Sequence, residues 1–305
     1  MATTSLTGST PRRHLRKQSR EARRLALARR QGLFGGDSKG AAVRRALSLQ
    51  DLEQAFRLVH SAYVEAGYIL PEPTGMRVRP YEALPEMATF IGEFDGQVVG
   101  VLGLVGDSAD MGLPSDEAFR DAIDGLRATG ARLSETTNQA IRPDFRGCAL
   151  TTELLRCMIA QAVAEGHDEI IAAASPGHEG FYTMMGFRRI ADVRSYSSKV
   201  YDPVVALSFN LRERDGAEEA EDHESFLRRF LYTDNPFREL AEDWQERASG
   251  IFRDPPDLCE LFATRSGMLA RCTPSELAAI RRRWTPAVFD KVMALVASGK
   301  DYRVA

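Results

Sequence analysis

The feature that most constrains the fold is a strand, a turn, a long helix, a second strand and a short aromatic helix that follow one another in mid-chain. The five segments are residues 132–141, 142–146, 150–165, 169–174 and 179–185. Along the long helix, Leu150, Leu154, Met158 and Ala162 recur at helical spacing, which predicts one apolar face. Strands that alternate with amphipathic helices are typical of an α/β layer architecture.

Flanking segments extend this pattern over residues 41–212. Ser48 begins a capping-box-like helix start. Asp95-Gly96 lies between two apolar runs and is the strongest hairpin signal in the chain, so those runs should be antiparallel neighbours. The predicted flanking elements are strands at 41–47, 88–94 and 97–105, a helix from 48, a helix near 115–129 and a last hairpin through 187–211.

The two ends of the chain differ from this domain in composition. Residues 1–40 are rich in Ser, Thr and Gly and become basic from Arg12 to Arg30, which predicts a solvated and largely disordered tail that could be helical from Ser19 to Gln31. Docking of this tail on an acidic partner or an anionic membrane surface, and an organellar transit peptide, are the alternatives. Residues 213–225 read as an acidic linker, and residues 226–305 as a helical C-terminal extension.

Composition excludes several classes of protein. A formal net charge of -3 gives no overall attraction to nucleic acid, and the sequence contains no apolar run long enough to span a membrane. The four scattered cysteines form no C-x-x-C pair and have no nearby histidines at ligand spacing, so neither a disulfide framework nor a metal site is predicted. We therefore expect a cytoplasmic protein.

The turn before the long helix is a candidate phosphate site. Arg146-Gly147-Cys148-Ala149-Leu150 leads from a strand into a helix start, where unpaired backbone N–H groups can hold a phosphate. Here the chain resembles the GNAT superfamily of N-acyltransferases, whose phosphate loop reads R/Q-x-x-G-x-G/A, with Arg146 at the leading position. Ala149 and Thr151 stand where this pattern has glycine and glycine or alanine. Steric need for a glycine in a tight turn is the alternative reading of Gly147.

The resemblance implies a GNAT fold, with a mixed, mostly antiparallel sheet flanked by helices, and an acid and a base. Phe181-Tyr182-x-x-x-Gly186-Phe187 looks like the F-Y-x-x-x-G-F signature, in which the tyrosine protonates the departing thiolate. Glu135 is the only carboxylate in its strand, and partial burial would raise its pKa into the range of a general base. A packed tyrosine and a structural hydrogen-bond acceptor are the alternative roles of Tyr182 and Glu135.

Three further stretches resemble the N-acyl amino acid synthase (FeeM-like) branch of this superfamily, a relative of the acyl-homoserine lactone synthases. They are Tyr63-x-x-x-Gly67-Tyr68, the segment 107–119 with its Gly112-Leu113-Pro114 core, and Pro176-x-His178-x-x-Phe181-Tyr182. Members of the branch transfer long acyl chains, often from acyl carrier protein, to amino acid amines. Asn138 stands where the lactone synthases usually have arginine, so a lactone product is not expected.

Further side chains are candidates for substrate contacts. His178, within a matched motif, is expected in the acyl or amine pocket, although a histidine beside a turn is more often a local hydrogen-bonding residue. Arg77 and Arg79 lie in a proline-rich loop near Tyr68, where an arginine fork can grip an amino acid carboxylate. Tyr68 and Phe181 are the other candidate substrate-binding residues. Two more arginines, Arg142 and Arg146, are expected to bind a phosphate-bearing arm or to steer an acidic carrier protein.

We therefore expect an acyltransferase that moves a long acyl group from an acyl carrier protein or coenzyme A thioester to the amine of an amino acid or similar small molecule. The thioester is a co-substrate, and no tightly bound cofactor is expected. A short-chain, acetyl coenzyme A-dependent N-acetyltransferase and a catalytically silent acyl-binding or regulatory module are the alternatives. Catalysis requires that two neighbouring strands part, so that Glu135 and Tyr182 face one slot.

Overall fold

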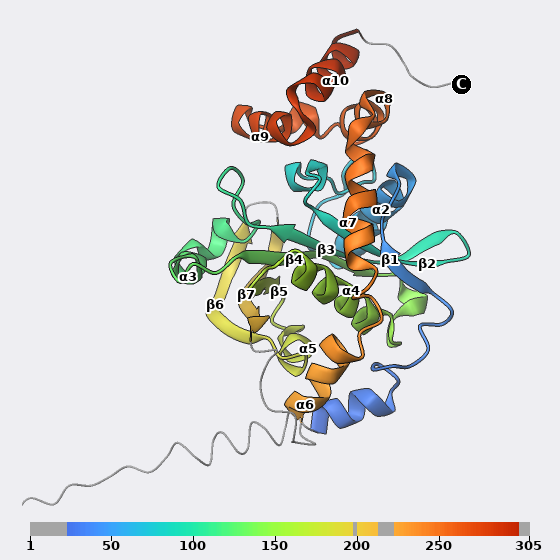
Figure 1. Ribbon diagram of the computed structural model, residues 1–305, viewed down its shortest axis with the longest axis vertical. Helices are drawn as coiled ribbons and strands as arrows, with labels where there is room; N and C mark the ends of the chain where they lie inside the picture. The colour runs from blue at the N-terminus through green and yellow to red at the C-terminus, as the bar shows by residue number, and fades with distance from the viewer. Residues whose placement is uncertain (1–22, 198–199, 213–222, 299–305) are drawn as a thin grey trace, which may run out of the picture.

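Seven strands form one mixed sheet at the centre of the protein. The computed structural model describes residues 23–197, 200–212 and 223–298, and within them the strands lie in the order β1-β2-β3-β4-β5-β7-β6 (Figure 1). β4 and β5 are parallel, whereas the other described neighbours are antiparallel, which confirms the expected α/β (α+β) sheet. In chain order the strands are β1 (Ala42–Arg45), β2 (Ala88–Phe94), β3 (Gln97–Gly106), β4 (Leu133–Ile141), β5 (Glu169–Ala174), β6 (Arg188–Ser197) and β7 (Val200–Asn210).

Local sequence explains where these elements begin and end. Ser48 caps a helix by accepting a hydrogen bond from the Asp51 backbone N–H at 3.1 Å. Asp95 and Gly96 have φ angles of 51° and 71°, the two positive values that a tight hairpin turn between β2 and β3 needs. The helices and short helical turns of this domain are α2 (Leu49–Glu65), η1 (Pro80–Ala83), α3 (Asp116–Arg127), η2 (Pro143–Phe145), α4 (Leu150–Ala164) and α5 (Glu179–Met184).

Helices cover both faces of the sheet. On one face α4 packs against residues such as Leu102, Leu104 and Ala172, and all four residues of its predicted apolar stripe are buried. On the other face α2 packs against Val101 and Val105, and α3 packs beside it over β4, β5 and β7. The sheet is therefore the middle of three layers, as the alternating pattern predicted.

β4 and β5 separate after a short stretch of pairing. Their register runs from Leu133 with Glu169 to Thr136 with Ala172, although β4 continues to Ile141. A bulge in β4 follows directly, because β3 advances from Val101 to Gly103 while β4 advances one residue more, from Ala140 to Thr137. Asn138 lies in the bulge at a φ of 54°, a left-handed conformation that asparagine tolerates better than most residues.

The C-terminal extension wraps around the domain. Figure 1 shows it crossing the α4 face as α6 and α7 and then reaching the opposite side of the molecule as α8, α9 and α10. Its secondary-structure elements within the described residues 223–298 are all helical, as predicted, and Thr273 makes a capping box with Glu276. Its elements are α6 (His223–Arg228), η4 (Arg229–Thr233), α7 (Ala241–Ser249), η5 (Gly250–Arg253), α8 (Pro255–Leu258), η6 (Cys259–Arg265), η7 (Leu269–Arg271), α9 (Pro274–Trp284) and α10 (Pro286–Ser298). Most of the predicted acidic linker, residues 213–222, lies outside the described residues.

The basic tail is packed where the structure describes it. Residues 23–30 are helical, and Leu25 and Ala28 are buried against the α4-side core. Arg29 stacks over the Phe226 ring with 4.3 Å between the guanidinium carbon and the ring centroid. The prediction of a solvated, disordered tail is therefore wrong for residues 23–34, whereas the helix allowed over residues 19–31 agrees with the helix at 23–30. The segment is packed because apolar side chains spaced along one helical face find partners on the domain. Residues 1–22 lie outside the described residues.

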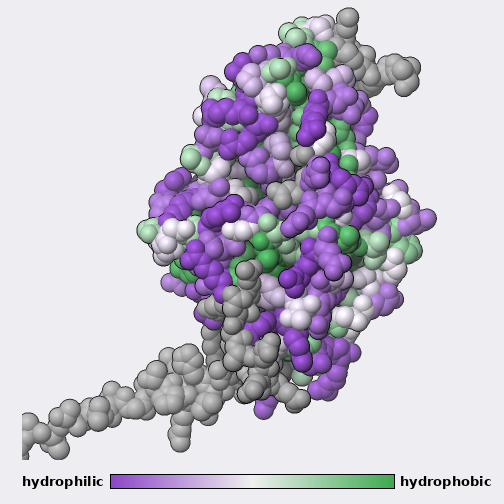
Figure 2. All heavy atoms as spheres, in the orientation of Figure 1, coloured by the Kyte–Doolittle hydropathy of each residue, from purple (hydrophilic) through white to green (hydrophobic). Residues whose placement is uncertain are grey.

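The visible surface is mostly polar. Figure 2 shows hydrophilic atoms over most of this face, with apolar atoms in the middle of the body and among the C-terminal helices. One apolar side chain, Val296 near the end of α10, is 43% exposed. No helix of the described residues has the length and apolar character needed to cross a membrane.

Candidate active site

A cavity of about 600 Å³ opens where β4 and β5 separate. Its volume lies in the range of small-molecule sites, roughly 300–1,000 Å³. Glu135 and Tyr182 both line it, but they enter from opposite faces of the sheet, which differs from the expectation that the two side chains face one slot together. Glu135 is paired with Val105 in register and shares its face with α2 and α3, whereas Tyr182 belongs to the α4-side core. The cavity therefore connects the two faces through the gap between the strands.

Glu135 is held by the start of α3. The side chain is 1% exposed, and its two oxygens accept hydrogen bonds from Ser115, from the backbone N–H at 2.8 Å and from the hydroxyl at 2.7 Å. Burial raises the pKa of Glu135 to about 7, although the Ser115 hydrogen bonds act against this shift. A carboxylate can accept about four hydrogen bonds, so Glu135 can still accept one from a substrate. A pKa near neutrality suits a general base.

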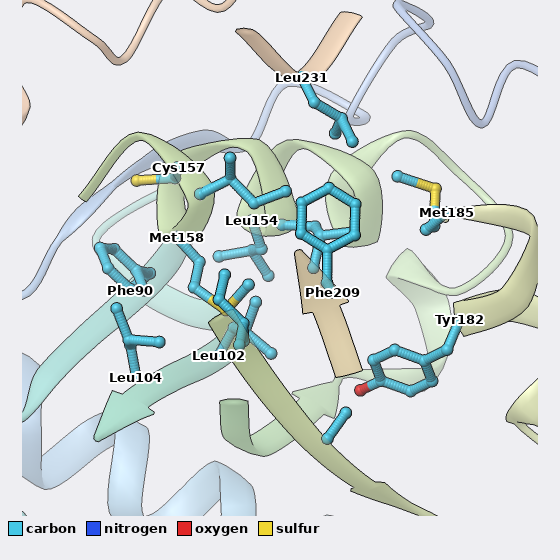
Figure 3. Close-up of a cluster of buried hydrophobic side chains, with 14 of the residues drawn as sticks. Phe90, Leu102, Leu104, Leu154, Cys157, Met158, Tyr182, Met185, Phe209 and Leu231 are labelled. Atoms are coloured by element: carbon cyan, nitrogen blue, oxygen red, sulfur yellow. The ribbon is translucent and has the colours of Figure 1, made fainter. Parts of the chain in front are cut away.

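Tyr182 is a neutral phenol at the edge of the α4-side core. Figure 3 shows it at the margin of the cluster, with Met185 and Phe209 nearby. Its hydroxyl donates to Gln139 Oε1 at 2.7 Å, and burial raises its pKa above the usual value. The phenol therefore keeps its proton at neutral pH and can act as an acid. The β4 bulge explains this contact, because it turns Gln139 to the α4 face.

A charged network lies on the α2 side of the cavity. Arg79 is paired with the buried Glu82 at 2.6 Å, and it also donates to Thr137 at 3.1 Å. Burial opposes the charge on both members of the pair, but their mutual attraction holds the pKa of Arg79 above, and that of Glu82 below, its usual value. Arg79 does not line the cavity, so the predicted fork of two arginines is reduced to Arg77.

Arg77 is the cation that faces the cavity from this network. It donates one hydrogen bond to Asn138 Oδ1 at 2.7 Å, and its guanidinium carbon lies 5.0 Å from the centroid of the Tyr63 ring. Burial and the nearby Arg79 lower its pKa. Among the residues that the structure describes, no carboxylate forms an ion pair with Arg77. An anionic substrate group would supply the missing partner.

Only part of the predicted phosphate turn lines the cavity. Arg146 and Thr151 line the cavity, whereas the Cys148, Ala149 and Leu150 side chains are buried in the core. Gly147 has a φ of 74°, which fits a glycine in the turn. α4 has no side-chain cap, so backbone N–H groups of its first turn are not used by a capping side chain. Arg142 pairs with Asp144 at 2.7 Å and does not line the cavity.

The remaining predicted residues lie around the cavity. Tyr68, His178 and Phe181 all line it, and His178 is exposed at the start of α5. Sequence reasoning did not assign roles to several other residues at the site: Ser115, Thr136, Gln139 and Tyr196. Ser115 could have been singled out from the sequence, because it directly follows the Gly112-Leu113-Pro114 segment that carries part of the family resemblance.

The mixed sheet, the gap between its two parallel strands and the cavity at that gap define an acyltransferase of the GNAT type. A family model described as N-acyl amino acid synthase FeeM matches residues 54–210, just over half of the chain. The chain belongs to this family, and it is an N-acyltransferase.

Several solved structures are similar to the chain over part of its length. FeeM, an N-acyl amino acid synthase from uncultured soil microbes, is 22% identical, with a TM-score of 0.51 over 57% of this chain and 92% of that chain. The acyl-homoserine lactone synthase LasI is 17% identical, with a TM-score of 0.45 over 56% and 89%. BjaI, a coenzyme A-dependent acyl-homoserine lactone synthase, is 16% identical, with a TM-score of 0.42 over 68% and 90%. No protein with a curated description matches the chain.

Proposed function

We propose that the protein joins an acyl group, carried as a phosphopantetheine thioester, to the amine of a small acceptor that also carries a carboxylate. The observation on which this depends is the single cavity into which Glu135 and Tyr182 project from opposite faces of the sheet. Two substrates that enter from opposite faces would meet in the gap between β4 and β5. The proposed acceptor side holds Glu135 and Arg77, and the proposed donor side holds Tyr182 and the start of α4.

The donor side offers backbone groups to the thioester arm. Beyond Thr136, the edge of β4 no longer pairs with β5, so the amides of a pantetheine arm can add to it as a short strand. The uncapped start of α4 favours a phosphate at the end of that arm, with Arg146 beside it. An apolar lining is available for the acyl chain on this side, and it includes Leu33, Ile141, Ala174 and Phe181.

Thr136 is suited to bind the thioester carbonyl. It is the last residue of β4 in register with β5, it lines the cavity, and only 5% of it is exposed. Its hydroxyl has no hydrogen-bond partner among the described residues. A buried hydroxyl without a partner costs about 1–3 kcal/mol. We infer that it donates to the carbonyl oxygen, whose negative charge grows as the amine attacks.

The proton transfers follow from the two sides. Glu135 accepts the proton that the acceptor ammonium must lose before its lone pair can attack the thioester carbon. The C–N bond forms, the C–S bond breaks, and Tyr182 gives its proton to the departing sulfur. Tyr182 regains a proton that leaves the reacting nitrogen. The products are an amide, a free thiol and one proton, so atoms and charge balance.

The donor is proposed to be a carrier protein rather than coenzyme A. The altered phosphate turn supports this, since a carrier-borne arm has one phosphate and no adenosine to recognise. Basic side chains of the described N-terminal segment, Arg23, Arg24, Arg29 and Arg30, lie on a helix packed beside the α4-side core and can attract an acidic carrier. Contact of the same residues with an anionic membrane surface is the alternative for this segment.

Product analysis tests the proposal. The protein is incubated with acyl carrier protein or coenzyme A thioesters of 2 to about 16 carbons and a mixture of amino acids, and products are identified by mass spectrometry. We expect N-acyl amino acids from the longer chains, with release of free thiol. Acetylated products alone would support the short-chain alternative. Tight binding of acyl thioesters without turnover would support a silent acyl-binding module and contradict the proposal.

A further inference from the structure

The C-terminal helices contribute no described side chain to the cavity, yet they contact the loops that build its acceptor side. The first of these loops, residues 76–87, carries Arg77, Arg79 and Glu82. The second, residues 107–116, ends in Ser115, which holds Glu135. We call these two segments the acceptor loops. They are far apart in sequence, so something must fix them relative to each other.

α9 contacts both acceptor loops through three consecutive residues. Trp284 is 1% exposed and donates from its indole N–H to the Ala83 carbonyl oxygen at 2.6 Å. Arg283 pairs with Glu86 of the first loop and, at 3.0 Å, with Asp110 of the second. Arg282 pairs with Asp110 at 2.9 Å. One turn of a helix therefore bridges the two loops from outside the cavity.

The loops and the C-terminal helices also share one apolar core. Met76, Ala83 and Leu84 are buried in the same cluster as Ile280 and Trp284. The loops also touch each other directly, because the Tyr81 hydroxyl donates to the Met111 carbonyl oxygen at 3.0 Å. α9 thus adds a second link between the two loops. Figure 1 shows α9 and α10 on this side of the sheet, away from α5.

We propose that α9 is a positioning element for the acceptor half of the site, so that acceptor affinity depends on contacts that lie outside the cavity. This inference depends on the proposed function for the identity of the two halves. Residues 211–298 lie outside the stretch that matches the family model, so the device belongs to this chain's own extension. Arg283 and Trp284 are positioning residues: they act through the loops and touch no substrate.

Two variants and a matched control test the proposal. Arg283→Gln removes the charged contacts to both loops, and Trp284→Phe keeps an aromatic ring but removes the hydrogen bond to Ala83. Arg281→Gln is the control, because Arg281 lies on the same helix and pairs with Asp290 of α10 at 2.9 Å without reaching a loop. We expect KM for the acceptor to rise roughly two- to thirtyfold in the first two variants, with KM for the thioester unchanged. The control should resemble the wild type.

Hydrogen exchange measured by mass spectrometry gives a readout that does not need turnover. We expect faster exchange in both acceptor loops of Arg283→Gln and no change there in Arg281→Gln. Unchanged exchange in the loops would overturn the proposal, and so would faster exchange with an unchanged acceptor KM. An inactive wild type with the expected exchange pattern would count against the proposed reaction but still show that α9 holds the loops. A similar rise of both KM values would instead indicate a general loss of structure and would also overturn the proposal.

Discussion

The two sides of the cavity are built by different kinds of interaction. On the donor side, the start of α4 and the free edge of β4 present backbone groups against an apolar core. On the acceptor side, charged side chains from separate loops hold one another, as in the pair of Arg79 and Glu82. Proteins that share a fold share its backbone geometry, whereas a side-chain network depends on the particular residues of each sequence. We therefore expect donor recognition to be shared with other proteins of this fold and acceptor recognition to be particular to this chain.

The largest expected effects come from the two groups that meet across the gap. Tyr182→Phe and Glu135→Gln should each lower kcat by about 10²–10⁴-fold, because each removes a proton transfer from the transition state. Steady-state kinetics with a thioester and an amino acid acceptor measures both, and thermal melting checks that the variants are folded. If both variants kept the wild-type kcat, Glu135 and Tyr182 would not be the base and the acid of the reaction.

Thr136 offers a second test of the donor side. Thr136→Val is nearly isosteric and should lower kcat by roughly 10²–10³-fold, the usual loss for one donor to a developing oxyanion. Because the valine has no buried hydroxyl without a partner, the free protein should also be more stable, by about 1 kcal/mol. Thr136→Ser should restore activity. A destabilised Thr136→Val variant with normal kcat would show that the hydroxyl has an internal partner and no role in catalysis.

The free energy of unfolding should fall as the pH rises, because Glu135 on the acceptor side becomes ionised in a buried position. The pKa of Glu135 is raised to about 7 in the folded protein, above its value of about 4.5 in the unfolded chain. Its contribution to stability is therefore fully present below pH 4.5 and is lost as the pH rises through 7. Compared with Glu135→Gln, the wild type should lose on the order of 3 kcal/mol of unfolding free energy between pH 4.5 and 8. Denaturant unfolding at several pH values measures this difference, and parallel curves would contradict it.

Arg77 should decide whether a carboxylate is required on the acceptor. Arg77→Gln should raise KM for an amino acid by about 10–100-fold, since a charged hydrogen bond contributes about 1.5–3 kcal/mol. The same variant should change little with the corresponding decarboxylated amine. Arg142→Gln is a suitable control, because Arg142 does not line the cavity. Equal losses with both acceptors would place the carboxylate elsewhere.

Ser115 should produce the smallest and most specific effect. The hydroxyl hydrogen bond from Ser115 lowers the pKa of Glu135, so Ser115→Ala should move the acid limb of the kcat/KM profile to higher pH by less than about one unit. Arg79, Asp116, Tyr81 and Tyr196 also face this carboxyl and stay unchanged in the variant. Ser115→Thr should leave the profile close to wild type. A shift to lower pH would contradict this reading of Glu135.

The sequence predicted the elements of the sheet better than the partners of the site residues. β5 begins and ends at the predicted residues, and the Asp95-Gly96 hairpin has the expected turn, because these features depend on local patterns. Tyr182 was singled out through its motif, and Glu135 as the only carboxylate of its strand. The pair of Arg79 and Glu82 was not foreseen, because the burial of Glu82 depends on the assembled sheet and not on its neighbours in sequence.

The packing of the basic segment also lay beyond local reasoning. The composition predicted a solvated tail, but the apolar side chains of Leu25 and Ala28 find partners when the α4-side core is assembled. Likewise, the contact between Tyr182 and Gln139 depends on the β4 bulge, and strict alternation along the strand would have placed Gln139 on the wrong face. Long-range partners and single-residue irregularities are the two kinds of information that a periodic pattern does not contain.

The bulge at Asn138 has a consequence for how this strand can vary. Regular alternation lets only one of two adjacent residues face α2, but the extra residue lets both Thr137 and Asn138 do so, since Arg79 donates to each of them. Removing Asn138 would leave Gln139, Ala140 and Ile141 on their present faces, because β3 and β4 would then advance by equal numbers of residues. The acceptor side would lose the amide that contacts Arg77 and Glu82, whereas the donor side would keep its lining. A deletion at this point should therefore impair the use of one substrate and spare the other.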